Sequence, residues 1–439
     1  MKVALISPAI ERQVSQKLKK TLAFFRSTLP YLAAFFPQDS DIRLIEESVE
    51  GPVEVARLVE DGVDFVGISP QTASATRGYE IAKNCKEMGL FVVMGGVHVS
   101  KVPYEALEYC DAVIIGEAEN SLPALLTHYK RGQFNGFLRP QERIYKSEPL
   151  PELTNIPTPK WGFMKKALID YATTVEIGRG CPYSCDFCSV HDLFGKRYRP
   201  RPVGEIVEEL TALGAKRVLF STDNLSANRS HVKELFSAVR SLGIEWMAEA
   251  TMSFAQDSEL VSLASKSGCK LIGIGFDSLS RNSLISVNKR FNEISQYYDC
   301  VSNLHDHGIA VGGSFIFGFD EDREGIAEET LEFSQKAKLD SVSAHILTPY
   351  PQTGIFKKFL KEGRLINADF PRDWSKYDTA HVVFLPRLMS PERLDAEYNT
   401  FKKEFFALSS IFQRSRYQER KTQDLLRYLA INLYYWYQS

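Results

Sequence analysis

Short apolar runs alternate with amphipathic stretches through the first third of the chain. The runs are four to seven residues long, and helical spacing of apolar residues appears between several of them, at 52–61 and 77–88. The predicted strands are 3–6, 43–46, 64–69, 90–96 and 111–116. Strands that alternate with helices are typical of a doubly wound parallel sheet, so we expect an α/β domain over residues 1–138.

The same alternation returns after residue 169 and continues to about residue 365. The predicted strands are 171–177, 217–222, 244–251, 270–276, 309–317 and 341–348. One predicted helix begins at about residue 203, and four more cover 230–242, 257–267, 291–307 and 323–337. Six strand–helix units predict a (β/α)6 partial barrel, and in barrels of this kind functional residues lie at the carboxyl ends of the strands.

Two further segments complete the predicted organisation. Residues 139–168 contain prolines at 140, 149, 151, 157 and 159 and are predicted to form a linker. Residues 366–439 are predicted to form a small helical domain, with helices at 391–412 and 420–437. The aromatic stretch 428–437 has two interpretations: a core helix that seals the barrel, or a lid or membrane-surface contact for an apolar substrate.

Composition is that of an ordinary soluble globular chain. It has 439 residues, 44% hydrophobic and 25% charged residues, and a net charge of -2. The absence of a basic excess argues against a nucleic-acid partner. The chain starts with a short apolar run rather than a signal peptide, and it has no apolar run of membrane-spanning length. We therefore expect a cytoplasmic protein, with at most a peripheral membrane contact.

The strongest chemical signal is a cysteine triplet that follows the first predicted barrel strand. Cys181, Cys185 and Cys188 have the spacing C-x3-C-x2-C, and Gly178 and Gly180 come just before them. A [4Fe–4S] cluster normally takes four thiolates. Three thiolates on one loop leave one iron without a protein ligand, and an open metal position can bind a substrate or cofactor.

Other interpretations of the triplet have weaker support. His191 could complete a Cys3His zinc site. A disulfide with a spare thiol is not expected in a chain without an export signal. A ferredoxin would need a fourth cysteine nearby, but the next one is Cys269. The scattered cysteines at 85, 110, 269 and 300 fit small core residues better than ligands.

The cysteine loop resembles the cluster motif of the radical S-adenosylmethionine (SAM) superfamily. This resemblance implies that Cys181, Cys185 and Cys188 hold a [4Fe–4S] cluster whose fourth iron chelates SAM. It implies reductive cleavage of SAM to a 5′-deoxyadenosyl radical that abstracts hydrogen from unactivated carbon. It also implies that Phe187 packs against the adenine.

The first domain resembles the cobalamin-binding domain that precedes many radical SAM domains. The resemblance is carried by 95–98, 103–107 and 111–119. Cobalamin-binding domains of mutases carry Asp-x-His-x-x-Gly after the first strand, whereas residues 7–12 here contain no histidine. His98 follows a different strand and is interpreted as structural. The residues predicted to contact cobalamin at the strand ends are Ser69, Thr72, Gly95, Gly96, Gly116 and Glu117.

Polar residues also follow the predicted barrel strands. The resemblance implies SAM contacts at these positions, which are Asp223, Asn224, Glu249, Asp277, Ser314 and Ile316. Three of them have a simpler explanation as well: Asp223 and Asn224 could cap a helix, and Glu249 could be a satisfied buried carboxylate or lie on an exposed face. Asp277 stands where the related motif has Glu, so its side chain is one methylene shorter.

The leading functional hypothesis is a cobalamin-dependent radical SAM methyltransferase that acts on an sp3 carbon of an apolar small molecule. The C-terminal region resembles that of enzymes that include hopanoid methylases. One alternative is another radical SAM reaction, such as carbon–carbon coupling or rearrangement, with a vestigial cobalamin domain. A second alternative is a non-enzymatic corrinoid or cluster sensor. The enzyme hypotheses require an external electron donor, such as flavodoxin or ferredoxin.

Overall fold

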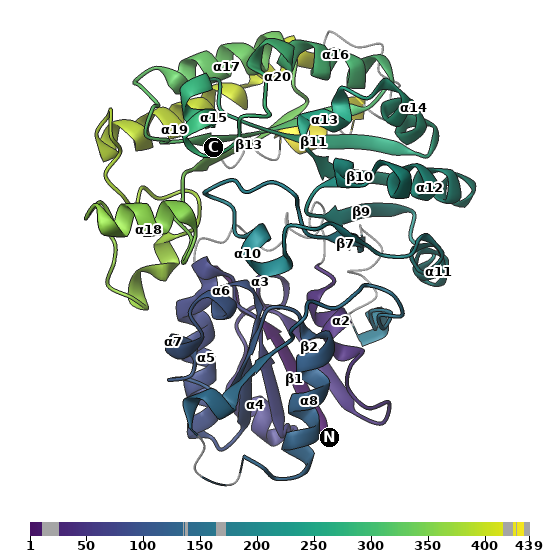
Figure 1. Ribbon diagram of the computed structural model, residues 1–439, viewed down its shortest axis with the longest axis vertical. Helices are drawn as coiled ribbons and strands as arrows, with labels where there is room; N and C mark the ends of the chain where they lie inside the picture. The colour runs from purple at the N-terminus through teal and green to yellow at the C-terminus, as the bar shows by residue number, and fades with distance from the viewer. Residues whose placement is uncertain are drawn as a thin grey trace.

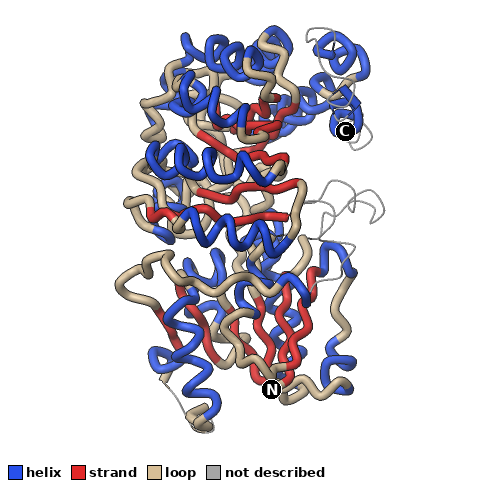
Figure 2. Tube along the Cα trace, turned by 90° about the vertical axis from the view of Figure 1, so that its right-hand side faces the viewer, coloured by secondary structure: helices blue, strands red, loops and turns tan. Residues whose placement is uncertain are grey.

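The computed structural model contains two α/β domains arranged one above the other along the long axis (Figure 1). It describes residues 1–10, 26–134, 136, 139–163, 173–415, 425–426 and 428–433. A view turned by 90° shows the two sheets as separate groups of strands, each with helices beside it (Figure 2). The chain passes from the lower domain to the upper one through the proline-rich segment.

The first domain is built on a six-stranded parallel sheet, sheet A, with the order β2-β1-β3-β4-β5-β6. Its strands are β1 (Lys2–Ser7), β2 (Asp41–Glu46), β3 (Phe65–Ile68), β4 (Phe91–Met94), β5 (Ala112–Ile115) and β6 (Ile144–Lys146). The five strands predicted from apolar runs are all present. The sixth, β6, was missed because it has only three residues and lies in the segment predicted as a linker.

Both faces of sheet A are covered by helices, as the doubly wound prediction requires. The helices of this domain are α2 (Thr28–Ala33), α3 (Glu47–Glu50), α4 (Val55–Glu60), α5 (Ala75–Glu87), α6 (Gly96–Lys101), α7 (Pro103–Ala106) and α8 (Ala118–Lys130). Alternate strand residues enter two different cores: Ala4 and Ile6 pack with residues of α4 and α5, and Val3 and Leu5 pack with residues of α2 and α8. Continuous apolar strands arise because both faces are buried.

The second domain is built on sheet B, with the order β13-β12-β11-β10-β9-β7-β8. Its strands are β7 (Thr173–Arg179), β8 (Arg199–Pro200), β9 (Arg217–Thr222), β10 (Glu245–Ala250), β11 (Cys269–Asp277), β12 (Ala310–Phe317) and β13 (Ser341–Ile346). The six long strands are parallel, which confirms the (β/α)6 prediction, and the two-residue β8 pairs antiparallel with β7.

Helices between the strands cover one face of sheet B. The helices after β7 are α10 (Val190–Phe194), α11 (Val203–Leu213), α12 (Arg229–Val239), α13 (Met252–Ala255), α14 (Ser258–Lys266), α15 (Arg281–Ser286), α16 (Tyr297–Asp306) and α17 (Ile326–Lys336). Strand residues such as Trp246, Ile274 and Phe315 are buried in the core shared with these helices. The residues that alternate with them therefore form the inner face of sheet B.

The C-terminal segment returns to the first domain. Helix α18 (Gly354–Lys361) leads to the short 3₁₀ helix η7 (Arg372–Lys376), which packs beside α5 and against the loop before it. The Trp374 indole N–H donates to Glu105 Oε1 at 2.9 Å, and Thr76 Oγ1 donates to the Pro371 carbonyl at 3.0 Å. Residues 269 and 295 positions apart in the chain thus hold the C-terminal segment against the first domain.

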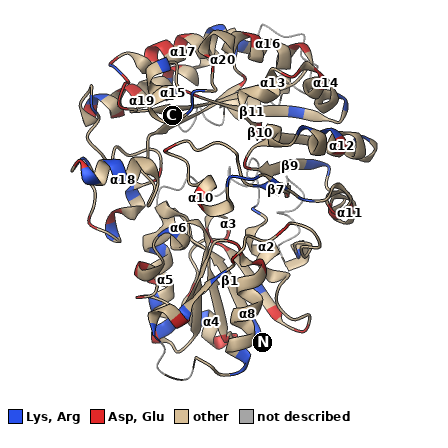
Figure 3. Ribbon diagram, viewed as in Figure 1, with Lys and Arg blue, Asp and Glu red and all other residues tan. Residues whose placement is uncertain are grey.

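The remaining helices are α19 (Pro391–Phe405) and α20 (Leu408–Ser415). The predicted helix 391–412 is therefore divided near residue 406. The predicted helix 420–437 is described at 425–426 and 428–433, and residues 428–433 are helical. In the aromatic stretch, Tyr428 is buried and its hydroxyl donates to the Ile411 carbonyl at 2.8 Å. In the part of the chain that the structure describes, no helix combines the length and apolarity needed to cross a bilayer. Lys or Arg positions and Asp or Glu positions are interspersed along the ribbon of both domains (Figure 3).

Candidate functional site

The cysteine loop begins where β7 ends. Gly180 has φ of +90°, and a Cβ there would overlap the carbonyl oxygen of Arg197, so only glycine fits without a shift of the backbone. The loop then turns back on itself, with the Cys188 N–H donating to the Cys185 carbonyl at 3.0 Å. Cys185 is buried, whereas Cys181 and Cys188 are half-buried. The loop therefore carries three thiols that are close together in the sequence. Two of them, Cys181 and Cys188, are accessible to solvent.

Asp186 fastens the middle of the loop to two distant segments. Its backbone N–H donates to the Val287 carbonyl at 3.1 Å, and its carbonyl accepts from the Ile355 N–H at 3.1 Å. Its Oδ1 accepts from Asn288 Nδ2 at 2.7 Å. The position of the cysteines therefore depends on the loop after α15 and on the start of α18.

Burial raises the pKa of the Cys185 thiol to about 12, although the nearby Lys289 opposes this shift. Burial also raises the pKa of Cys188. Binding of a metal must therefore displace protons from these thiols. His191, the candidate fourth zinc ligand, has its Nε2 3.2 Å from Asp192 Oδ1. Within the described ranges, no three His, Cys, Asp or Glu side chains could share a single metal ion.

Two predicted residues at the end of β9 contact the cysteine loop directly. Asp223 Oδ2 accepts from the Gly180 N–H at 2.7 Å, and burial raises the pKa of this carboxyl to about 6. Asn224 is buried and caps the 3₁₀ helix η4 (Leu225–Ala227). Its Nδ2 lies 3.7 Å from Cys181 Sγ. The capping role anticipated for Asn224 is present, together with this contact to a thiol.

The other predicted residues of the second domain lie on neighbouring strands. Glu249 on β10 lies on the concave inner face, where its side chain is accessible to solvent. The protein that surrounds this face desolvates the carboxylate and raises its pKa. No hydrogen-bond partner of its carboxylate occurs among the described residues. Ser314 and Ile316 share the inner face of β12 and are half-buried.

Asp277 and Phe187 already have protein partners. Asp277 ends β11 with φ of +63°, and it forms a buried ion pair with Lys289. Phe187 is half-buried, and its ring centroid lies 5.9 Å from that of Phe319. Neither contact tests the role in SAM binding that the sequence predicts for these two residues.

A cavity of about 310 Å³ lies where the carboxyl ends of sheet A face the second domain. Five of the six positions predicted there contribute to its lining: Ser69, Gly95, Gly96, Gly116 and Glu117. The sixth residue, Thr72, is buried and does not line the cavity; its hydroxyl lies 3.3 Å from His98 Nδ1.

His98 lies away from the cavity lining. Its side chain is fully buried, and its Nε2 lies 3.1 Å from the Tyr79 hydroxyl and 3.5 Å from Glu105 Oε1. Burial lowers the pKa of His98. His98 therefore belongs to a buried polar cluster with Tyr79 and Glu105, and Trp374 contacts this cluster through Glu105.

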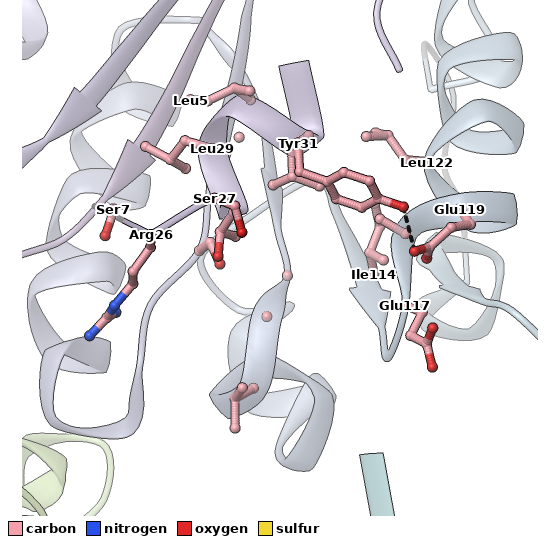
Figure 4. Close-up of a pocket in the computed structure, with 18 of the residues that line it drawn as sticks. Leu5, Ser7, Arg26, Ser27, Leu29, Tyr31, Ile114, Glu117, Glu119 and Leu122 are labelled. Carbon is pink, nitrogen blue, oxygen red and sulfur yellow. Dashed lines mark hydrogen bonds between the residues drawn. The ribbon is translucent and has the colours of Figure 1, made fainter. Parts of the chain in front are cut away.

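The cavity has an apolar side and a polar side. Leu5, Leu29, Ile114 and Leu122 line it between sheet A and helices α2 and α8 (Figure 4). On the polar side, Tyr31 points toward Glu119 and donates to its Oε1 at 2.6 Å (Figure 4). The Oε2 atom of Glu119 is buried and has no hydrogen-bond partner among the described residues, so it is available to a donor on a ligand.

Arg179 joins the cavity to the cysteine loop. It is two residues before Cys181, and its guanidinium bonds Glu117 Oε2 and Glu119 Oε1, both at 2.5 Å. It also makes two bonds of 2.8 Å to Glu176. Arg199 pairs with Glu117 from the other side. Because these side chains are at most 27% exposed, they form a largely buried network between the two domains.

Arg179 and Glu119 were missed by sequence reasoning. A usable signal was present: an arginine next to the cysteine motif and two glutamates directly after a buried strand are charges that must be paired if they are buried. Their partners come from different domains, however, and pairing across that distance cannot be read from local patterns.

Comparison with known protein families gives two matches. The radical SAM superfamily matches residues 175–334, and the B12 binding domain matches residues 27–126. These ranges contain the cysteine loop and most of the cavity lining, respectively.

The chain is similar to curated methyltransferases. It is 34% identical over 363 residues to the bacteriochlorophyllide d C-12(1)-methyltransferase of Chlorobaculum tepidum, covering 80% of this chain and 77% of that protein. It is 27% identical to the C-8(2)-methyltransferase of the same organism, covering 92% and 91%. It is 24% identical to the hopanoid C-2 methylase of Rhodopseudomonas palustris, covering 77% and 64%.

Among solved structures, the chain resembles the radical SAM methyltransferase TsrM from Kitasatospora setae, determined with cobalamin and a [4Fe–4S] cluster. The TM-score is 0.66 at 14% sequence identity, covering 91% of this chain and 88% of TsrM. At this identity the similarity shows a shared fold of both domains.

We predict that Gly180→Ala prevents stable cluster assembly. The added Cβ meets the Arg197 backbone, and alanine is strained at φ of +90°, so the loop must shift. Iron and sulfide content after anaerobic reconstitution measures the effect.

The control is Gly204→Ala, since a Cβ at that helical position has open space. Full cluster content in Gly180→Ala would contradict the assigned loop geometry.

Proposed function

The chain belongs to the family of cobalamin-dependent radical SAM methyltransferases, and we propose that it methylates an unactivated sp3 carbon of a flat, largely apolar small molecule. The observation that carries this proposal is the meeting of two sites. A three-cysteine loop and a cavity at the carboxyl ends of sheet A adjoin each other at Arg179.

Cys181, Cys185 and Cys188 would hold the [4Fe–4S] cluster. The loop fits this group because it offers three thiols, a glycine where a side chain would clash, and an amide directed at one thiol. When both cofactors are bound, the cluster supplies reductive cleavage of SAM to a hydrogen-abstracting radical, and cobalamin supplies the methyl group. The protein's own residues position these groups and exclude water.

The cavity fits cobalamin in two respects. Its apolar side, lined by Leu5, Leu29 and Ile114, suits the flat benzimidazole of the nucleotide tail. The unpartnered Oε2 of Glu119 suits an amide N–H of a corrin side chain.

A histidine ligand to cobalt is not part of this proposal. The described portion of the loop after β1 ends at Ile10 without a histidine, and the ring nitrogens of His98 face Thr72 and Tyr79. We therefore assign no cobalt ligand to the described residues.

SAM would lie beside the cysteine loop at the strand ends of sheet B. Glu249 is a candidate contact because its carboxylate is exposed on the inner face and lacks a partner in the described part of the chain. Ser314 and Ile316 lie on the inner face two strands away. Asp277 would contribute to SAM binding indirectly, because it holds Lys289 in a buried ion pair near Cys185.

For the substrate we propose a chlorophyllide-type tetrapyrrole. The relatives with 34% and 27% identity are both named as bacteriochlorophyllide d methyltransferases. A hopanoid-like polycycle is the competing substrate class.

The reaction requires electrons from outside the chain. We propose a soluble low-potential carrier, such as flavodoxin or ferredoxin, and a cytoplasmic location where such carriers and reduced thiols occur together.

The proposed reaction predicts transfer of a deuterated methyl group to bacteriochlorophyllide d. Anaerobically reconstituted protein receives dithionite, SAM with a CD3 group and the pigment, and mass spectrometry follows both pigment and SAM products. We expect a pigment that carries one CD3 group, together with 5′-deoxyadenosine and S-adenosylhomocysteine.

Cys185→Ala is the control, and it should form neither deoxyadenosine nor labelled pigment. Deoxyadenosine without labelled pigment would reject the tetrapyrrole substrate, and a labelled hopanoid in a parallel assay would replace it. Absence of deoxyadenosine from protein with an intact cluster would reject the radical reaction.

We also predict that Ala118→Phe weakens cobalamin binding while leaving the cluster intact. Ala118 lines the cavity at the start of α8, so a phenyl ring there occupies ligand space. Overpacking of about 1–3 kcal/mol corresponds to roughly 5–150-fold weaker binding. Cobalamin absorbance retained after desalting measures it.

Ala124→Phe is the matched control, because Ala124 is on the exposed side of the same helix. Equal cobalamin retention in Ala118→Phe and in the native protein would contradict the assigned cavity.

A further inference from the structure

We infer that Asn224 is a positioning residue for the cluster, and that its amide N–H donates to the sulfur of Cys181 and raises the reduction potential of the cluster. The inference rests on the proposed binding of the cluster by Cys181, Cys185 and Cys188. It concerns one residue at the end of β9 and its distance of 3.7 Å, Nδ2 to Sγ, from the first cysteine.

The orientation of the Asn224 amide is fixed by its oxygen. Oδ1 accepts from the Ser226 backbone N–H at 3.1 Å and from the Ser226 hydroxyl at 2.9 Å. An amide reversed by 180° would place its N–H groups against the Ser226 backbone N–H, which can only donate. The nitrogen must therefore occupy the other side, which faces Cys181.

Ser226 is itself held in place. Its hydroxyl lies 2.8 Å from Thr251 Oγ1 and 2.9 Å from Ser253 Oγ, and these two hydroxyls are 2.8 Å apart. Thr251 and Ser253 follow β10, so two neighbouring strand ends fix one serine. The amide of Asn224 is therefore held in one orientation before a cluster binds. Asn224 as a whole is only 3% exposed.

Asp223, the residue before Asn224, braces the same loop through the Gly180 N–H. Residues 223 and 224 therefore contact the two positions that begin the cysteine loop, Gly180 and Cys181. These two contacts fix the start of the cysteine loop beside the Asn224 amide.

A hydrogen bond to a ligating thiolate withdraws electron density from the cluster. The reduced cluster carries one more negative charge than the oxidised one, so the bond stabilises the reduced state more strongly. Removal of the bond should shift the midpoint potential to a more negative value, and reduction by a given carrier becomes less favourable.

The test is a redox titration of the reconstituted protein, monitored by EPR of the reduced cluster and carried out without substrate. Asn224→Asp keeps the shape and the capping oxygen but replaces the N–H donor with an acceptor. Asn224→Ser keeps the capping oxygen on a shorter side chain. We expect a more negative midpoint potential in both variants, with the larger shift in Asn224→Asp.

Asn228 provides matched controls because it is also an N-cap, accepting from the His231 N–H at 3.1 Å, and has no bond to a cysteine. Asn228→Asp and Asn228→Ser should leave the potential unchanged. An unchanged potential in Asn224→Asp with full iron and sulfide content would overturn the inference, as would equal shifts in the Asn228 variants.

Should Asn224→Asp fail to hold a cluster, Asn224→Ser tests the same bond, because it keeps a capping oxygen and removes the amide N–H. A more negative midpoint potential in that variant supports the inference, and an unchanged potential overturns it. A native protein that binds no cluster under these conditions would instead reject the proposed function itself.

Discussion

The arrangement of the two sites depends on the ion pairs of Arg179. This side chain ends β7 in the second domain, and its partners Glu117 and Glu119 follow β5 in the first. Removal of one partner from a buried ion pair typically lowers the free energy of unfolding by about 3–5 kcal/mol, because the other charge is left buried without a counter-charge. The network therefore favours one relative placement of the cavity and the cysteine loop, which is what a reaction shared between two cofactors requires.

A second polar contact holds the other side of the interface. Trp374 reaches Glu105, which also accepts from Tyr79 and lies beside the buried His98. The segment that follows the last barrel strand thus packs against the first domain and connects it to the barrel. With both contacts in place, each domain limits the movement of the other.

The sequence predicted most of the architecture because local patterns determine it. The run Arg217–Thr222 matches β9 residue for residue, and the glycines at 95, 96 and 116 mark strand ends that line the cavity. Strand β6 was missed, since three residues carry too little periodicity. Contacts across domains were also missed, because nothing local connects Arg179 to Glu117. Asn224 shows an intermediate case: its cap was anticipated as an alternative, but its contact with Cys181 required the fold.

The proposed reaction requires the cluster and cobalamin to occupy adjacent sites in one protein. EPR spectroscopy of protein that carries both the reduced cluster and cob(II)alamin tests this claim directly, because nearby unpaired electrons broaden and split each other's signals. We predict such spin–spin coupling in the doubly loaded native protein. A spectrum equal to the sum of the two singly loaded samples would contradict the account.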